Sequence, residues 1–407
     1  MRCERMRSRN ERENVRILCG MNVIVLSHLR WDFVFQRPQH LMTRCARTNP
    51  VLFVEEPIFD ADVPCLKAHE PRTGLTVLTP HLPAGLNAHE QSQMQERLLT
   101  QYLGKHKVGE FVLWYYTPMA VGFTRTLNPE AVVYDCMDEL SGFRGAPPGL
   151  RAAEAELFRR ADLVFTGGQS LYRAKQSQHP SVHCFPSSIE RDFFAGAREP
   201  HPEPADQAAI PHPRLGYSGV IDERMNIDLI AALAAARPDW HIVMLGPVVK
   251  ISESDLPRLA NIHYLGGKPY QLLPAYMAGW DVGVLPFAEN EATRFISPTK
   301  TPEYLAAGLP VVSTPITDVV EQYGSAGLVA IAKNTDEFVH AVSDVLPTRH
   351  SRERLARADA FLAKMSWDLT WSRMLKLIQA ARRRKTVPQV AQTDPGLLVK
   401  PYPAVGD

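Results

Sequence analysis

Residues 295–308 read FISPTKTPEYLAAG, and the apolar run PVVS follows at residues 310–313. The pattern predicts a loop, a short helix that ends at Gly308, and a buried strand. Lys300 and Glu303 are three residues apart near the helix start, so they share one helical face. Unpaired N–H groups and the positive end of the helix dipole lie at that same end. This geometry suits a nucleotide diphosphate, with Lys300 on the phosphates and Glu303 on the ribose hydroxyls; a surface salt bridge is the alternative.

The same alternation of short apolar runs and helical patterns extends over most of the chain. The runs are rich in Val, Ile and Leu without polar alternation, as in strands buried on both faces of a parallel sheet. Repeated β-α units of this kind predict an α/β protein with doubly wound parallel sheets. The expected strands are 23–28, 51–55, 75–78, 111–116, 132–135, 163–166 and 182–185, then 215–220, 241–245, 262–265, 282–286, 311–313 and 328–331.

A proline-containing segment without a periodic pattern, residues 196–213, separates two such series of elements. We expect it to be a linker between two Rossmann-like domains, 21–195 and 214–365. Two such domains would face each other across a cleft, because ligands bind at the carboxyl ends of their strands. The remaining segments are expected to be a C-terminal helix at 366–385, a disordered extension at 1–20 and a disordered tail at 386–407.

Size and composition exclude several classes of protein. The chain has 407 residues, 45% of them hydrophobic, and its charges nearly cancel to a net charge of +1. That balance predicts no nucleic-acid partner, because nucleic-acid-binding domains are usually strongly basic. No apolar stretch approaches the roughly 20 residues that cross a bilayer. The six cysteines form no Cys-x-x-Cys pair, which favours buried free thiols in a cytoplasmic protein over disulfides or a zinc site.

Further candidate ligands for the nucleotide flank the opening segment. Gly219 lies in the turn after the first strand of the second half and would let backbone N–H groups approach a phosphate. Arg224 could add a second cation, since a nearby cation contributes several kcal/mol to diphosphate binding before desolvation. Ser297 begins the approach to Lys300. The loop before it carries three polar candidates for the sugar and the diphosphate, or else is simply solvated: Asn290, Thr293 and Arg294.

Two strand ends in the first half carry candidate catalytic residues. His28 ends the first strand and precedes an aromatic loop with Phe33 and Phe35, which could stack on a sugar or pack against the next helix. The Gly-x-Gly-x-x-Gly turn of dinucleotide-binding enzymes is missing there, which argues against an NAD enzyme. Asp138 follows the strand at 132–135 and is the candidate general base toward an acceptor hydroxyl. Its alternative role is to cap the following segment.

A cluster of positive charge, RRRK at residues 382–385, ends the last expected helix. Cations at a helix C-terminus complement the helix dipole. The alternative is a contact with an anionic membrane surface, where each charge contributes about 1 kcal/mol.

Three motifs of the second half carry a resemblance: GVIDER at 219–224, LGPVVK at 245–250 and SPTKTPEY at 297–304. Together they make residues 215–314 resemble the nucleotide-binding domain of bacterial glycosyltransferases with the GT-B fold, related to family four. In the first half, WDFVFQRPQH at 31–40 is similar to the opening of teichuronic-acid-type glycosyltransferases of the same group.

The resemblance implies two facing Rossmann-like domains with a C-terminal helix that crosses back to the first. It places the donor nucleotide in the second domain and the acceptor in the first, with no metal ion or cofactor. Glu303 matches the second glutamate of the family's Glu-x7-Glu pair, the ribose ligand, and Lys300 matches a diphosphate-binding lysine. The first glutamate would fall at Phe295, so the contact with the donor sugar departs from the family pattern.

These observations predict a metal-independent glycosyltransferase that moves a sugar from a nucleoside diphosphate, with UDP as the expected nucleotide. The acceptor would be a glycan, a lipid-linked molecule or a small molecule in cell-envelope or exopolysaccharide synthesis, with peripheral contact at the inner face of the plasma membrane. A sugar-nucleotide 2-epimerase and a catalytically silent glycan-binding subunit are the alternatives. If the enzyme retains the anomeric configuration, Asp138 is not needed as a base.

Overall fold

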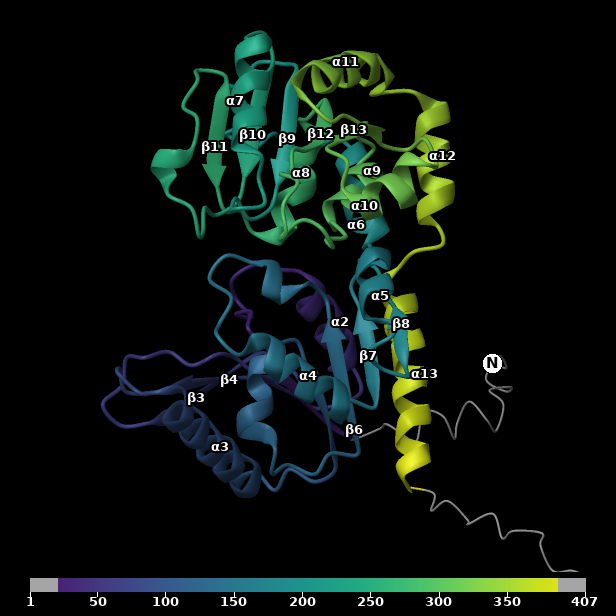
Figure 1. Ribbon diagram of the computed structural model, residues 1–407. Helices are drawn as coiled ribbons and strands as arrows, with labels where there is room; N and C mark the ends of the chain where they lie inside the picture. The colour runs from purple at the N-terminus through teal and green to yellow at the C-terminus, as the bar shows by residue number, and fades with distance from the viewer. Residues whose placement is uncertain (1–20, 387–407) are drawn as a thin grey trace, which may run out of the picture.

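The computed structural model describes residues 21–386, which form two α/β domains stacked on each other (Figure 1). The expected extension at 1–20 lies outside the described residues, and so does the expected tail at 386–407 except for Thr386, which ends a helix. Each domain contains one largely parallel sheet between helices, so the expected pair of Rossmann-like domains is confirmed.

The first domain is built on an eight-stranded sheet with the order β3-β4-β2-β1-β5-β6-β7-β8. Every described neighbour pair is parallel except β3 and β4 at the edge. The strands are β1 (Asn22–Leu26), β2 (Val51–Val54), β3 (Cys65–Arg72), β4 (Leu75–His81), β5 (Phe111–Tyr115), β6 (Ala131–Cys136), β7 (Leu163–Thr166) and β8 (Val182–Cys184).

The edge strand β3 is not among the expected strands. Its sequence CLKAHEPR has no apolar run, and all of its side chains except Leu66 are exposed. It pairs with β4, and Leu66 is the β3 residue that packs against the core, so the hydrophobic pattern of the sequence does not reveal this strand.

Successive residues of the buried strands face two separate cores in the first domain. Val25 of β1 belongs to the core beneath α2 and α13, while Ile24 belongs to the core beneath α3, α4 and α5. This alternation is the ordinary two-residue period of a strand. The helices are α2 (Arg37–Cys45), α3 (Ala88–Lys105), α4 (Leu150–Arg160), α5 (Gln169–Lys175) and α13 (Trp367–Thr386).

The second domain has a six-stranded parallel sheet with the order β11-β10-β9-β12-β13-β14. Its strand order reverses beside β9, as in a dinucleotide-binding fold. The strands are β9 (Arg214–Ser218), β10 (His241–Leu245), β11 (Ile262–Gly266), β12 (Val282–Leu285), β13 (Val311–Ser313) and β14 (Ala330–Ile331). The helices are α7 (Ile227–Ala236), α8 (Leu273–Ala278), α9 (Lys300–Ala306), α10 (Thr317–Val319), α11 (Thr335–Val345) and α12 (Arg352–Leu362).

The segment between the two sheets, expected as a linker at 196–213, packs on the second domain. It follows α6 (Arg191–Ala195), and its residues Ala197 and Ile210 belong to the second-domain core. Gln207 is fully buried and accepts a hydrogen bond from Trp280 Nε1 at 2.9 Å. Its prolines therefore stiffen an ordered connection and do not mark a free tether.

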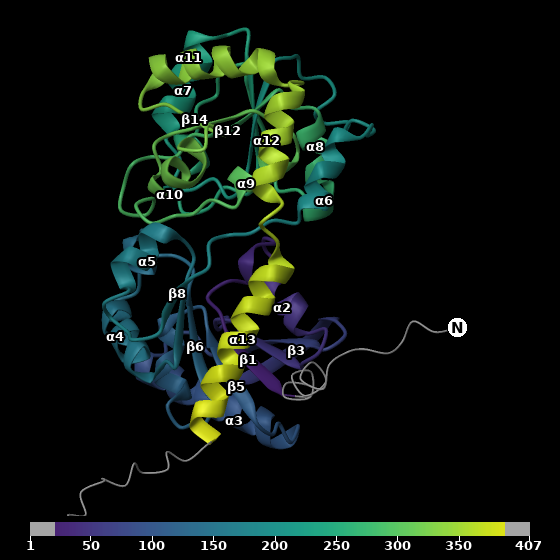
Figure 2. The ribbon, with the colours of Figure 1, turned by 90° about the vertical axis from the view of Figure 1, so that its right-hand side faces the viewer.

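After α12 the chain returns to the first domain, where α13 lies along the sheet (Figure 2). Trp367 and Met374 of α13 are buried in the first-domain core, which confirms the expected crossover helix. The basic end of α13 is partly paired with first-domain carboxylates: Arg382 lies 3.6 Å from Glu110 and Lys385 lies 2.8 Å from Asp162.

Both passages of the chain between the domains meet on α2. Arg44 Nη2 lies 3.2 Å from Glu190 Oε1, just before α6, and 2.9 Å from Asp368 Oδ2 at the start of α13. The ring of Trp367 stacks on His40 of α2 at a centroid distance of 4.7 Å.

Three further features concern the chain between residues 21 and 386. None of the helices described there is long and apolar enough to cross a membrane. Nor does that part of the chain bring together three or more His, Cys, Asp or Glu side chains that could hold a metal ion. Its cysteines, Cys45, Cys65, Cys136 and Cys184, are free thiols.

Candidate functional site

The two domains contact each other through a small set of polar and aromatic groups. Asp318 of α10 is buried and accepts hydrogen bonds from the N–H groups of Gln169 and Ser170 at 2.8 and 2.9 Å. These N–H groups begin α5, where a carboxylate is favoured by the helix dipole. The exposed pair Arg173 and Glu321 adds two hydrogen bonds beside them. The carboxyl ends of the two sheets are thereby held facing each other.

Three adjoining cavities lie where these strand ends face each other. The first, here called the glycine-turn cavity, has a volume of about 530 Å³ and is lined by Gly219, Gly246 and Lys300. The second, the central cavity, has a volume of about 130 Å³ and also contacts Gly219 and Lys300. The third, the His28 cavity, has a volume of about 410 Å³ and shares Asp138 and Arg224 with the central one.

The glycine-turn cavity owes its shape to two turns that only glycine can form. Gly219 after β9 has a φ of 154° and Gly246 after β10 has a φ of 151°. A Cβ atom on Gly246 would lie 1.7 Å from the carbonyl oxygen of Gly219, so the two turns touch backbone to backbone. The Gly219 turn also lies close to Lys300: a Cβ atom on Gly219 would lie 3.6 Å from Lys300 Cε.

The helix that carries Lys300 is fixed to the sheet by a buried tyrosine. Tyr304 of α9 packs directly over Gly283 of β12, where a Cβ atom would lie only 2.6 Å from its ring. Its hydroxyl oxygen accepts a hydrogen bond from the N–H of Ser218 at 2.7 Å, at the end of β9. The start of α9 is thereby held beside the Gly219 turn.

Lys300 and Glu303 share one face of α9, as the sequence predicts. Lys300 Nζ donates a hydrogen bond to Glu303 Oε2 at 2.8 Å. Burial raises the pKa of Glu303, and the neighbouring Lys300 ammonium opposes that rise. Lys300 lines both the glycine-turn and the central cavity, whereas Glu303 lines neither and lies beneath Lys300 with 4% of its surface exposed.

An aromatic wall closes the glycine-turn cavity, made by Phe35 of the aromatic loop noted in the sequence and by Tyr270, which the sequence analysis missed. Tyr270 and Phe35 both line it, with ring centroids 4.6 Å apart across the domain boundary. The Tyr270 hydroxyl oxygen is buried and has no hydrogen-bond partner among the described residues. Burial, and then the nearby Glu303 and Glu190 carboxylates, raise the pKa of this hydroxyl. Tyr270 begins a short 3-10 helix, Tyr270–Leu272, that leads into α8, and its sequence carries no motif.

Arg224 lies between the central and the His28 cavities, as the expected second cation would. Its guanidinium is already bound by Asp222, with Nη2 and Oδ2 2.8 Å apart. It also lies over the ring of Phe143, at 5.6 Å from the centroid. Part of its positive charge is therefore neutralised, as Glu303 neutralises part of the charge on Lys300. Lys300 is the stronger candidate for a diphosphate contact because it lines both the glycine-turn and the central cavity.

Asp138 lies on the opposite side of the same junction and lines both cavities. Burial raises the pKa of its carboxyl, while the Arg224 and Arg37 guanidinium groups lower it. Asp135 lies three residues earlier, in β6. It is fully buried and bound by Arg37 at 2.8 Å. Of these two carboxylates, only Asp138 faces space that a substrate can enter.

His28 contributes an unpaired nitrogen to the His28 cavity. Its Nδ1 atom is buried and has no hydrogen-bond partner within residues 21–386. Burial lowers the pKa of the imidazole to about 4. The ring is therefore neutral near pH 7 and can accept a hydrogen bond from a hydroxyl group.

The remaining sequence candidates divide into two groups. Ser297 lines the central cavity. Asn290, Thr293 and Arg294 line none of the three cavities. Asn290 and Thr293 bind each other, at 3.0 and 3.1 Å, and so close their own loop, while the exposed Arg294 faces Glu291. Their polar groups stabilise the loop that leads to α9.

Lys250, the last residue of the LGPVVK motif, is a further cation at the site to which the sequence analysis assigned no role. It lines the His28 cavity, lies 4.7 Å from the centroid of the Phe143 ring and pairs with Glu223 at 3.5 Å. Its place at the end of that motif, in the loop after the second strand of the domain, could have identified it as a site residue.

The comparisons with known proteins agree with this architecture. Residues 212–347 match the family model described as "Glycosyl transferases group 1". In overall fold the chain is similar to sucrose-phosphate synthase from Thermosynechococcus elongatus, with a TM-score of 0.67 and 14% identity, covering 89% of this chain and 100% of that one. It is also similar to a UDP-forming trehalose-phosphate synthase from Burkholderia xenovorans, in complex with glucose-6-phosphate. The TM-score is 0.64 at 13% identity, and the match covers 88% of this chain and 100% of that one. The expected GT-B fold is confirmed, and residues 212–347 form a glycosyl transferases group 1 domain.

A sequence relative adds a more particular likeness. Over 224 residues the chain is 27% identical to "Putative teichuronic acid biosynthesis glycosyltransferase TuaH" of Bacillus subtilis. The match covers 50% of this chain and 55% of that protein, so it spans about half the length of each. This likeness agrees with the family resemblance inferred from residues 31–40 and from the second-half motifs.

Proposed function

We propose that the protein transfers a sugar from a nucleoside diphosphate to an acceptor hydroxyl. The observation that carries the proposal is the line of three adjoining cavities, with Lys300 between the first two and Asp138 between the last two. The group 1 domain supports the same class of reaction.

In this proposal the nucleoside occupies the glycine-turn cavity, against Tyr270 and Phe35. The diphosphate lies at Lys300, beside the close backbone turns of Gly219 and Gly246, and the sugar occupies the central cavity. As the glycosidic bond breaks, negative charge develops on the departing diphosphate. Lys300, assisted by the partly neutralised Arg224, stabilises that charge in a site shielded from water.

The acceptor enters the His28 cavity from the first domain. Asp138 lies where it can take the proton of the attacking hydroxyl, and a carboxyl whose pKa is raised by burial is a stronger base than an exposed one. His28 accepts a hydrogen bond from the acceptor and orients it. This assignment requires an inverting reaction; under retention, both residues position the acceptor only.

UDP is the proposed nucleotide, and cell-envelope or exopolysaccharide glycan is the proposed product. The UDP-forming neighbour of similar fold and the teichuronic acid relative support these choices. A cytoplasmic location at the inner face of the plasma membrane would give the enzyme access to both substrates.

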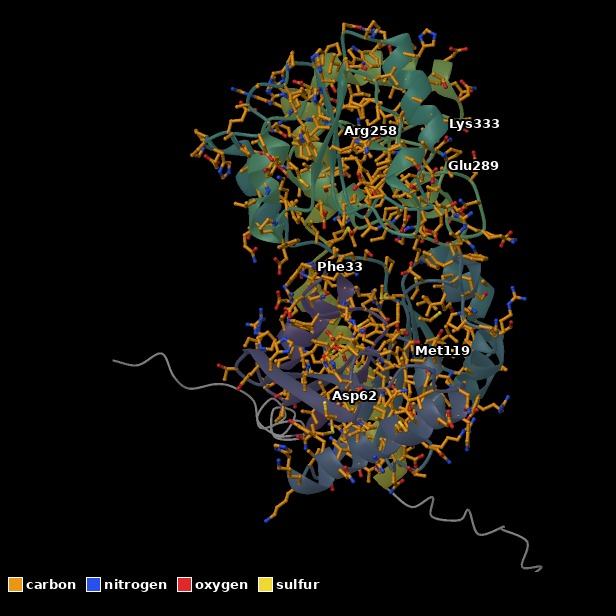
Figure 3. The ribbon with its side chains drawn as sticks, turned by 90° about the vertical axis from the view of Figure 1, so that its left-hand side faces the viewer. Phe33, Asp62, Met119, Arg258, Glu289 and Lys333 are labelled. Atoms are coloured by element: carbon orange, nitrogen blue, oxygen red, sulfur yellow. The ribbon has the colours of Figure 1, made fainter. Side chains whose placement is uncertain are left out.

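The decisive experiment compares Lys300→Ala with Lys333→Ala in titrations with UDP by calorimetry. Lys333 is exposed on the second domain (Figure 3) and lines none of the three cavities. We expect Lys300→Ala to weaken UDP binding about 10- to 100-fold, the usual loss for a charge-assisted contact. Lys333→Ala should bind as wild type does. Equal affinities in the two variants would refute the proposed donor site. A thermal-shift screen with UDP-, GDP-, ADP- and dTDP-sugars then identifies the donor.

A further inference from the structure

A fourth cavity extends the His28 cavity into the first domain, beneath α3. This α3 cavity has a volume of about 310 Å³. It shares four lining residues with the His28 cavity, at the boundary between the two: Glu56, Thr117, Met119 and Pro147. It lies on the side away from Lys300, so nothing in the proposed donor site reaches it.

Nine of the sixteen residues that line the α3 cavity are apolar, and the seven polar ones are Ser27, Glu55, Glu56, Gln91, Ser92, Gln95 and Thr117. Leu26 and Val54 line it from strand ends, Phe59 lines it from the loop after β2, and Phe123 lines it from beneath α3. No lysine or arginine is among the described residues of this wall, in contrast to the glycine-turn, central and His28 cavities.

Two carboxylates reach this wall. Glu55 accepts hydrogen bonds from Arg30, from the N–H of Trp31 and from Thr79. Glu56 is exposed at the boundary with the His28 cavity. An anionic ligand would therefore meet no complementary charge among the residues described for this wall.

Exposed apolar side chains gather around the same part of the molecule. Phe33 is 50% exposed, Phe59 is 44% exposed and Met119 is 38% exposed. Phe33 and Met119 border the His28 cavity, and Phe59 and Met119 border the α3 cavity. Two further exposed residues, Ile58 and Val63, flank Phe59 along its loop. Apolar surface gathered around a cavity usually marks a binding site for an apolar group.

We propose that the acceptor is an amphiphile, whose acyl, alkyl or isoprenoid chain occupies the α3 cavity while its hydroxyl-bearing end lies in the His28 cavity beside Asp138. The inference rests on the proposed glycosyl transfer and specifies its acceptor. The occupant is the chain of the acceptor itself: the cavity continues directly from the acceptor space, and its walls offer apolar contact but no cation.

Two soluble probes test the proposal, methyl β-D-glucoside and n-octyl β-D-glucoside, the latter below its micelle concentration. They differ only in the apolar chain. We expect wild type to bind the octyl compound at least about tenfold more tightly by calorimetry, because the chain is removed from water. Equal affinity for the two probes, including undetectable binding of both, overturns the proposal.

Matched variants locate the effect. Phe59→Ser and Met119→Ser should each lose most of the octyl preference, whereas Leu369→Ser should keep it. Leu369 is a comparably exposed residue, at 39%, on the far helix α13. Because all three side chains are more than a third exposed, the variants should fold, which circular dichroism checks. An octyl preference that survives both first-domain substitutions also overturns the proposal.

UDP titrations of the same proteins separate this inference from the proposed function. Phe59→Ser and Met119→Ser should bind UDP as wild type does, since neither residue lines the glycine-turn or central cavity. Normal UDP binding without an octyl preference refutes the amphiphilic acceptor alone. Failure of wild type to bind UDP or any other nucleotide refutes the proposed transfer itself, and with it the acceptor assigned to it.

Discussion

The glycine-turn cavity and the α3 cavity lie at opposite ends of one line of cavities and are built in different ways. The first is formed by backbone turns at Gly219 and Gly246, with two lysines, Lys268 and Lys300, in its wall. The second is formed mostly by apolar side chains from separate strands, loops and helices, with no cation among its described residues. In the proposed function, recognition of a phosphate is thus concentrated in short sequence motifs, while recognition of the acceptor is spread over side chains distant in the sequence.

The largest expected effect divides turnover from donor binding. Asp138→Asn should lower kcat about 100-fold or more if Asp138 is the base, with UDP affinity unchanged, because its carboxylate belongs to the acceptor side. Steady-state kinetics with the donor found by the nucleotide-sugar screen measures the change. The exposed Asp62→Asn serves as the control (Figure 3). A normal kcat would assign the reaction to retention without a side-chain base.

The second prediction tests the glycine-turn cavity, the proposed donor site. Gly246→Ala adds a Cβ atom 1.7 Å from the Gly219 carbonyl oxygen at a φ of 151°. We expect a loss of about 3 kcal/mol in the free energy of unfolding, from strain and overpacking, together with weaker UDP binding. Urea denaturation measures the stability. The control is Gly267→Ala, whose Cβ atom would meet only Pro247, at 3.8 Å. Equal stability of the two variants would contradict the tight double turn.

The third prediction concerns pH and the acceptor end. The pKa of His28 falls from 6.5 to about 4 on folding, so between these values the unfolded chain binds more protons at this site. Acidification from pH 6.5 to 4 should therefore destabilise wild type relative to His28→Gln, by up to about 1.4 kcal/mol per pH unit. Urea denaturation of both proteins at pH 7, 6 and 5 tests this. A difference that does not change with pH would mean that His28 is not buried as a neutral ring.

The smallest effect concerns how the two ends are held together. Asp318→Asn removes the charge that binds the N–H groups of Gln169 and Ser170, so domain closure should weaken by about 1 kcal/mol. We expect a two- to fivefold rise in the donor KM and a larger radius of gyration in X-ray scattering. Arg173→Ala, which breaks an exposed pair, should change less. An unchanged radius and KM would show that other contacts hold the domains.

The sequence predicted the parts that depend on local pattern. Buried parallel strands are continuous apolar runs, so the two sheets and their division were found, and the spacing of Lys300 and Glu303 gave their shared face on α9. The exposed edge strand β3 has no such run and was missed. The motifs also led to Ser297 and Gly219, which both line the central cavity.

The rest depends on contacts that sequence order does not contain. Tyr270 and Phe35 are distant in the chain and meet only when the domains face each other. Asn290, Thr293 and Arg294 carry suitable polar groups near Lys300 in sequence, but their loop closes on itself and turns them from the cavities. Glu303 lies on the expected face yet beneath Lys300, a depth that helical spacing does not specify.

The two passages of the chain between the domains, near Glu190 and near Asp368, are both anchored to Arg44. Covalent connections that run so close together act as a hinge and leave one easy motion, a swing of one domain about that point. The cavities would then open at the side away from α13, and substrates would enter and products leave there. If the chain were cut between α12 and α13, only one connection would remain, and the second domain could rotate in other directions as well.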